Sequence, residues 1–295
     1  MSAPLRGMSL AAGAAALAAV FLVLYKAAQD FAPRGDVVAA MILGSAAFNS
    51  ATALAQERRL PRLDGTSWKA ALALSVGTIV GNVGVAESLG QCEPAVTSVL
   101  MQTQVLFVAL MARAALGEPI TRRFVLGVVV ALAGVVLMRA PLAGEAAPRV
   151  SLGGVFWALA AAAAFGSMQV ITRKVIDRIR PVAVNAVRLW LAAFLLLAMP
   201  GRLGSLATMP AAGWGLAFGA AACGPFASRL ALMYAVRTIP ASQSVLFGLV
   251  APVLAFGLGW AVFGTVPSGR ELLGGLVILA GVAIPIHEAL VARRA

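Results

Sequence analysis

The chain carries the apolar stretch VLGVVVALAGVVLM at residues 125–138, and about 147 positions later it carries LLGGLVILAGVAIP at residues 272–285. Both stretches have a Gly at their third position and the sequence Ala-Gly-Val six residues after it, and neither contains a charged residue. With their apolar flanks they approach the roughly 20 residues that a helix needs to cross a membrane. We therefore expect a fold built from membrane-spanning helices that occur in two copies.

The composition excludes a single water-soluble core. Of the 295 residues, 61% are hydrophobic and only 12% are charged, whereas soluble domains carry roughly 25% charged residues. The apolar residues form ten segments that lack the alternation of a membrane barrel, so we predict helices. The predicted segments are 8–28, 35–56, 70–90, 94–115, 124–140, 152–173, 182–199, 212–234, 242–263 and 271–291. The expected fold class is an all-α integral membrane protein with ten transmembrane helices.

The two halves of the chain repeat each other at an offset of about 146 to 148 residues. Ordered matches over three separate helices are hard to obtain from composition alone. The matched pairs include Pro94/Pro240, Val99/Val245, Leu100/Leu246, Ala109/Ala255, Gly117/Gly264, Gly127/Gly274, Ala133/Ala280, Gly134/Gly281 and Val135/Val282. Because five helices per copy is an odd number, the copies must be inverted, with a substrate site between them near the bilayer midplane. We predict a first repeat at residues 1–140, a linker at 141–151 and a second repeat at 152–295.

The Lys and Arg residues predict the orientation. Of the 23 in the chain, Lys26, Arg188 and Arg229 fall inside predicted spans, and fifteen of the rest fall on the side of both termini. The five on the opposite side are Arg34, Arg139, Arg149, Arg202 and Arg270. Since cytoplasmic loops carry the excess of Lys and Arg, we predict a bacterial-type inner membrane protein with both termini cytoplasmic. This clustering between apolar runs also argues against nucleic-acid binding, despite the formal net charge of +12.

Polar side chains inside spans are costly in lipid and are therefore candidates for function. The candidate cavity residues are Asn49, Thr52, Asn82, Glu87, Gln102, Gln104, Asn185, Arg188, Trp190 and Tyr234. Packing between helices is the alternative for most of them, and reach to the membrane interface is the alternative for Arg188. Arg188 is the first choice for an anionic substrate group, because a guanidinium can hold a carboxylate with two hydrogen bonds.

Three other candidates have separate roles. Glu87, near a helix end, can bind an ammonium group or carry a coupling proton, and a solvated carboxylate is its alternative. Trp190 can form an apolar wall or a cation–π surface for a substrate. Pro252 and Gly257 are candidates for a bend that gates the site, although helix packing is favoured for both.

Each repeat begins with a helix that ends in a Lys-bearing segment followed by Pro, at Lys26/Pro33 and Lys174/Pro181. Each ends with a Gly turn and a Gly- and Val-rich helix, and the first such turn is Leu116-Gly117-Glu118-Pro119. In these features the chain resembles the EamA branch of the drug/metabolite transporter superfamily over essentially its whole length. The resemblance implies a ten-helix carrier with inverted repeats, and the aromatic-amino-acid exporter group is the nearest subgroup. The chain departs from the repeat pattern at two places. The second turn, Gly264-Thr265-Val266-Pro267, lacks the Glu that follows Gly117 in the first, and Ala40 of the first repeat is at the position that Arg188 has in the second.

We therefore expect a secondary transporter that exports small metabolites, most of all amino acids, by alternating access. The alternative within transport is a multidrug or quaternary-cation exporter, which should favour a buried acid and an aromatic cage. An enzyme is not expected, because the four Asp lie at loops or helix ends and the single His287 lies near the C-terminus. A channel would need a continuous polar pathway.

The expected partners are a small-molecule substrate and the lipid bilayer, with a monomer as the assembly. The sequence has no nucleotide-binding loop, metal-ligand cluster or other cofactor motif, so we expect no cofactor.

Overall fold

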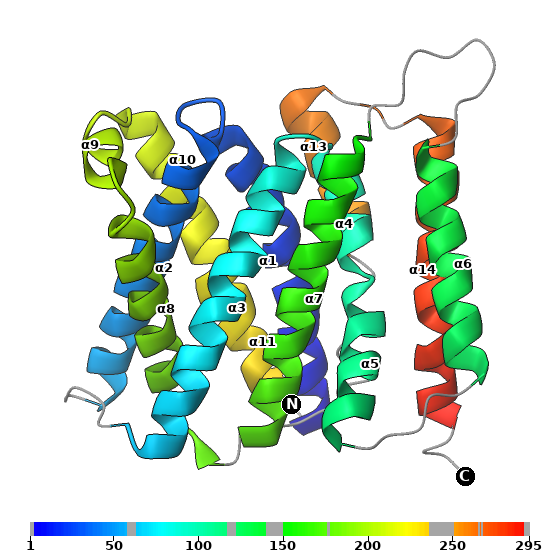
Figure 1. The fold of residues 1–295 in the computed structure, drawn as a ribbon, viewed down its shortest axis with the longest axis horizontal. Coiled ribbons are helices and arrows are strands. Elements are labelled where there is room, and N and C mark those ends of the chain that lie inside the picture. The colour runs from blue at the N-terminus through cyan, green and yellow to red at the C-terminus, as the bar shows by residue number, and fades with distance from the viewer. Residues whose placement is uncertain are drawn as a thin grey trace.

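The computed structural model describes residues 3–57, 63–116, 122–139, 150–175, 178–235, 251–264, 266 and 268–291. Figure 1 shows these residues as a bundle of long helices, and none of them forms a strand. The first half contains α1 (Ala3–Ala28), α2 (Arg34–Glu57), α3 (Gly65–Leu89), α4 (Pro94–Met101), α5 (Gln104–Leu116) and α6 (Arg122–Arg139). The second half contains α7 (Leu152–Val175), α8 (Pro181–Leu197), α9 (Arg202–Ala207), α10 (Ala211–Ala221), the π-helical η2 (Ala222–Ser228), α11 (Arg229–Ala235), α13 (Ala251–Phe263) and α14 (Gly269–Val291).

These elements correspond to the ten predicted spans. The pair α4–α5 forms one interrupted crossing, and α10, η2 and α11 together form another. By length and composition, six of the described segments can cross a membrane, and three shorter apolar helices accompany them. Part of the predicted span 242–263 lies outside the described residues, and α13 covers the rest. The all-helical, ten-span fold class is therefore confirmed.

Contacts at one end of the bundle show that the two halves run in opposite directions. Lys26, in the last turn of α1, donates a hydrogen bond to the carbonyl oxygen of Leu89 at the end of α3. Ser151, which immediately precedes α7, donates to Gln91, just beyond α3, at 2.9 Å. The C-terminal end of α1 therefore lies beside the N-terminal end of α7. Since α1 and α7 are the first helices of the two repeats, the repeats are inverted.

The packing partners exchange in the same way. The third crossing of the first half, α3, packs on α7, and the third crossing of the second half, α10–η2–α11, packs on α1. Close approach of α3 and α7 depends on small residues: a Cβ added at Gly77 or Gly81 would stand 2.5 Å from Met168 or Phe165. Small residues of this kind let helices in membranes pack backbone to backbone.

The last helices of the two repeats, α6 and α14, pack along each other at one side of the bundle (Figure 1). A Cβ added at Gly134 would stand 2.7 Å from the carbonyl oxygen of Gly274, and one added at Gly281 would stand 2.7 Å from that of Gly127. These four glycines are the pairs that the sequence repeat matches. The contact is therefore reciprocal and depends on backbone proximity that only glycine permits.

Candidate functional site

A cavity of about 280 Å³ lies between the two halves of the chain, at the level of the central turns of its helices. Helices α1, α3, α4 and α5 line it from the first half, and α7, α8, η2, α11 and α13 line it from the second. Most of the wall is apolar and includes Phe21, Met101, Phe165 and Met168. Its polar side chains are those of Asn82, Ser98, Gln102, Gln104, Gln169, Arg188, Ser228 and Arg229. A concave, mainly apolar site with a few polar groups is typical of small-molecule binding.

Arg188 is a cation held in place by neutral partners. It lies inside α8, and only 4% of its surface is exposed. Its Nε donates to Oδ1 of Asn185 at 2.6 Å, and its Nη1 donates to the hydroxyl oxygen of Thr78 in the other half. Asn185 in turn donates to Oδ1 of Asn49 at 2.6 Å. This chain of hydrogen bonds fixes the guanidinium without neutralising its charge.

Arg229 is the second cation of the cavity, and it follows an irregular stretch of helix. Pro225 has no backbone N–H to donate, and the surrounding residues form the π-helical segment η2. Within η2, a Cβ added at Gly224 would stand 2.5 Å from the ring of Phe21, so the backbone lies directly against α1. Single π turns occur frequently at functional sites. Within the described part of the chain, the Arg229 guanidinium has no hydrogen-bond or ion-pair partner.

Four amide side chains supply most of the remaining polar surface. Gln102 and Gln104 flank the interruption between α4 and α5, Asn82 comes from α3 and Gln169 from α7. The Asn82 amide donates to the carbonyl oxygen of Thr78 at 2.7 Å, one turn before it in α3. An amide offers two donor hydrogens and an acceptor oxygen. This wall can therefore bind donors or acceptors of a solute without adding charge.

The lining residues that the structure describes include no Asp or Glu. Residues 236–250 lie outside the described ranges, and their sequence contains no Asp or Glu either. The described polar surface of the cavity thus combines two positive charges with neutral amides and hydroxyls.

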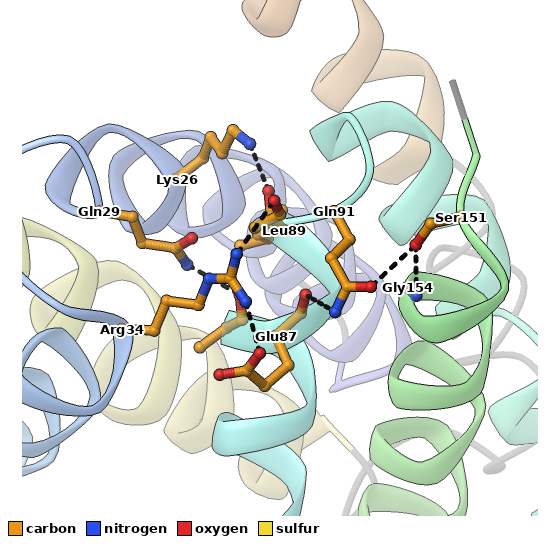
Figure 2. A network of polar contacts seen from close by, with 10 residues as sticks. Lys26, Gln29, Arg34, Glu87, Leu89, Gln91, Ser151 and Gly154 are labelled. Carbon is orange, nitrogen blue, oxygen red and sulfur yellow. Dashed lines mark hydrogen bonds and ion pairs between the residues drawn. The ribbon is translucent and has the colours of Figure 1, made fainter. Parts of the chain in front are cut away.

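Acidic side chains gather instead at the end of the bundle that lies away from the N-terminus. Arg34, at the start of α2, forms an ion pair with Glu87 near the end of α3, as Figure 2 shows. The distance from Nη1 of Arg34 to Oε2 of Glu87 is 2.5 Å. In the same network, Lys26 donates to a carbonyl at the end of α3, and Ser151 donates to Gln91. The network joins the ends of α1, α2 and α3 to the start of α7.

A second ion pair joins the two halves at this end. Asp36 in α2 is 1% exposed, and its two carboxylate oxygens accept hydrogen bonds from Arg202 and Ser205. Both donors belong to α9, the short helix between α8 and α10. These ion pairs and hydrogen bonds form one region, the polar end, which comprises Lys26, Arg34, Asp36, Glu87, Gln91, Ser151, Arg202 and Ser205.

Four of the predicted site residues line the cavity together: Asn82, Gln102, Gln104 and Arg188. Asn49 and Asn185 are buried behind Arg188 and reach the cavity only through the hydrogen bonds that hold it.

The remaining candidates lie away from the cavity lining. Glu87 belongs to the polar end, and the Thr52 hydroxyl donates to the carbonyl oxygen of Phe48 within its own helix at 2.9 Å. Trp190 is 47% exposed, and its indole N–H donates to the Ser50 hydroxyl at 2.8 Å. Three further candidates are also placed elsewhere: Tyr234 packs in an apolar cluster beside α2 and α8, Pro252 is buried in α13, and Gly257 faces open space.

Sequence reasoning did not select four of the polar side chains that line the cavity: Ser98, Gln169, Ser228 and Arg229. The sequence places Arg229 inside a predicted span but near its end, where an Arg side chain can also reach the membrane interface. Gln169 does carry a signal, because it is an amide between Met168 and Val170, about one turn before the end of the segment 152–173.

Ten spans in inverted halves, with a mainly apolar cavity between them, are the architecture of a membrane transporter. The EamA-like transporter family model matches residues 5–140 and again residues 152–286. The chain therefore belongs to the EamA-like transporter family, within the drug/metabolite transporter superfamily, and carries two copies of its domain.

Comparison with solved structures supports the same fold. A structure described only as "Crystal structure of protein" is similar with a TM-score of 0.64 and 22% sequence identity. The similarity covers 97% of this chain and 98% of the other. No curated protein matches the chain.

Proposed function

We propose that this transporter exports amino acids and closely related small metabolites across the bacterial inner membrane by alternating access. One observation carries the proposal: the oriented, uncompensated guanidinium of Arg188 faces a cavity whose other polar groups are largely amides. A guanidinium binds a carboxylate in a two-point geometry, and amide oxygens accept hydrogen bonds from an ammonium group. The cavity thus offers partners for both ends of an amino acid.

The inverted halves supply a route for the solute. When the two inverted halves exchange conformations, a site between them that was open to one side of the membrane becomes open to the other. The polar end ties α1, α2 and α3 to α7 and α9. These contacts must break for a solute to pass through that end.

Counterflow tests the proposal directly. Purified protein in liposomes is loaded with single unlabelled solutes, and uptake of labelled amino acids is measured against uptake of methyl viologen. The panel includes Phe, Tyr and Trp, because the sequence resembles the aromatic-amino-acid exporters. We expect exchange of at least one amino acid, and its loss in Arg188→Met. Exchange of the cation without exchange of any amino acid would favour the drug exporter and overturn the proposal.

The orientation is part of the proposal. The described cations of the end opposite the N-terminus are Lys26, Arg34, Arg139, Arg202 and Arg270, and more Lys and Arg lie at the other end. The positive-inside rule then places both termini in the cytoplasm. A reporter that is active only outside the cytoplasm should be inactive when fused after residue 295 and active when inserted between α9 and α10. The reverse pattern would overturn the orientation.

We propose facilitated exchange rather than proton antiport. The described cavity lining contains no carboxylate that can carry a proton. Glu87, the best candidate from the sequence, pairs with Arg34 instead. Wild-type transport should therefore be independent of an imposed pH gradient, and Glu87→Gln should behave in the same way. A pH-gradient dependence in the wild type that Glu87→Gln abolishes would overturn this proposal and assign proton coupling to Glu87.

A further inference from the structure

The charge inside the cavity exceeds what one carboxylate can balance. Arg188 and Arg229 come from different helices, α8 and α11, and both face the same space. Their charges repel each other, and no described lining residue is acidic. A site that holds two cations without a counter-charge favours a ligand that brings negative charge with it.

The two guanidiniums also differ in how many of their N–H groups are available to bind a ligand. Arg188 uses Nε and Nη1 for Asn185 and Thr78, so its Nη2 edge is the part that a ligand can engage. Arg229 has no partner among the described residues for any of its N–H groups. Two donor groups on separate helices can each take a different carboxylate of one solute.

The neutral amide side chains around the two arginines add to the preference for a negatively charged ligand. The amides of Asn82, Gln102, Gln104 and Gln169 can bind a hydroxyl or an ammonium group, but they do not neutralise a guanidinium. A neutral zwitterion would satisfy one arginine and leave the second charge buried without a partner, which is costly in a low-dielectric site.

Resting on the proposed function, we infer that the cavity selects solutes with two carboxylates, and that Arg229 is the residue that distinguishes them from solutes with one. Acidic amino acids and simple dicarboxylates share this chemistry. A volume of about 280 Å³ is at the lower end of the range for small-molecule sites, roughly 300–1,000 Å³, and suits solutes of this size.

The experiment compares acids with their amide twins. Purified full-length protein is titrated with glutamate against glutamine, aspartate against asparagine, and succinate against succinamate, with the unfolding temperature as readout. Counterflow in liposomes is then measured with labelled glutamate, labelled glutamine and labelled succinate. Each twin keeps the shape of the acid and removes one negative charge, so the comparison isolates the second carboxylate.

We expect the dicarboxylates to bind at least tenfold more tightly than their amide twins. In Arg229→Gln that difference should shrink to less than about threefold, mainly because the acids bind less tightly. Arg229→Lys, which keeps the charge but loses the two-point geometry, should retain a preference of intermediate size. The matched control is Arg123→Gln, which removes an exposed Arg at the start of α6 and should retain the full preference.

The outcomes separate this inference from the proposed function. Equal affinity for glutamate and glutamine, with both exchanged in liposomes, would overturn the inference and leave amino-acid export intact. A preference that survives in a folded Arg229→Gln would also overturn it. Exchange of succinate without exchange of glutamate would retain the two-carboxylate rule and assign it to dicarboxylates. If no amino acid or dicarboxylate is bound or exchanged, the proposed function and the inference both fail.

Discussion

The arginines of the cavity and those of the polar end stand in opposite electrostatic settings. At the polar end, Arg34 pairs with Glu87 and Arg202 pairs with Asp36. In the cavity, Arg188 is bound by neutral Asn and Thr side chains, and Arg229 has no described partner. The same residue type therefore forms an ion pair between helices at the polar end and has no described counter-charge in the cavity.

This difference indicates which arginines stabilise the packing of the helices and which bind a ligand. Removing a paired Arg leaves a carboxylate without its partner, so stability or gating should change first. Removing a cavity Arg leaves no such carboxylate, so recognition should change first.

Arg188→Met should nearly abolish transport while the protein still folds. Hydrogen bonds to charged groups contribute about 1.5–3 kcal/mol, so the loss should be about 10- to 100-fold in transport rate at low solute concentration. Rates in liposomes are compared at equal amounts of monodisperse protein. The transport rate of Arg188→Lys should lie between those of the wild type and Arg188→Met, and Arg123→Gln serves as the control. Wild-type transport by a folded Arg188→Met would show that Arg188 does not bind the solute.

Asp36→Asn should lower stability more than it lowers transport. The substitution removes the counter-charge of Arg202 from a buried site, and Arg202 remains partly exposed, so we expect a loss of about 2 kcal/mol. The measurement is thermal unfolding in detergent, with Asp30→Asn as a control because Asp30 is exposed. An unchanged unfolding temperature together with a large loss of transport would place Asp36 in the transport mechanism.

Glu87→Gln should have a smaller effect on stability, since both partners of the Arg34–Glu87 pair are about one-third exposed. Such pairs contribute roughly 0–1 kcal/mol. Because the contact must break when the polar end opens, the transport rate should change only about two- to fivefold, and the order of solute preference should stay the same. A changed order of preference would show that Glu87 contacts the solute.

The smallest expected effect is on the reactivity of Cys92, in the turn between α3 and α4. Burial raises the pKa of its thiol, so the reactive thiolate is scarce at neutral pH. In a Cys223→Ser background, maleimide labelling should be slow and should accelerate as the pH rises past the usual cysteine range. Adding Glu87→Gln should speed it further, if that variant opens the polar end more often. Fast labelling at neutral pH in the parent would contradict the closed polar end.

The architecture was predictable because hydropathy and the internal repeat act over many residues. Twenty apolar positions tolerate an error of several residues at a boundary, and matches such as Gly134/Gly281 fix the relation between the halves. Asn185 and Arg188 were both selected as candidates from the sequence. Residues three apart are neighbours on a helix, and the structure joins these two by a hydrogen bond.

The composition of the cavity was harder to predict because it depends on local helix geometry. Trp190 follows Arg188 by two residues, which rotates it by about 200° in an α-helix, and the structure places it on the exposed side. Arg229 follows the π-helical η2, whose altered hydrogen-bond pattern shifts the faces of the helix beyond it. A helical pattern with a period of 3.6 does not contain that shift.

The reciprocal glycine contact between α6 and α14 has a consequence for motion. When two inverted halves trade conformations, a contact between equivalent helices is carried onto itself, because each partner takes the place of the other. The Gly134–Gly274 and Gly281–Gly127 approaches should therefore look the same before and after the exchange. The α6–α14 pair is then a stationary frame of reference, against which the displacement of the other helices can be measured.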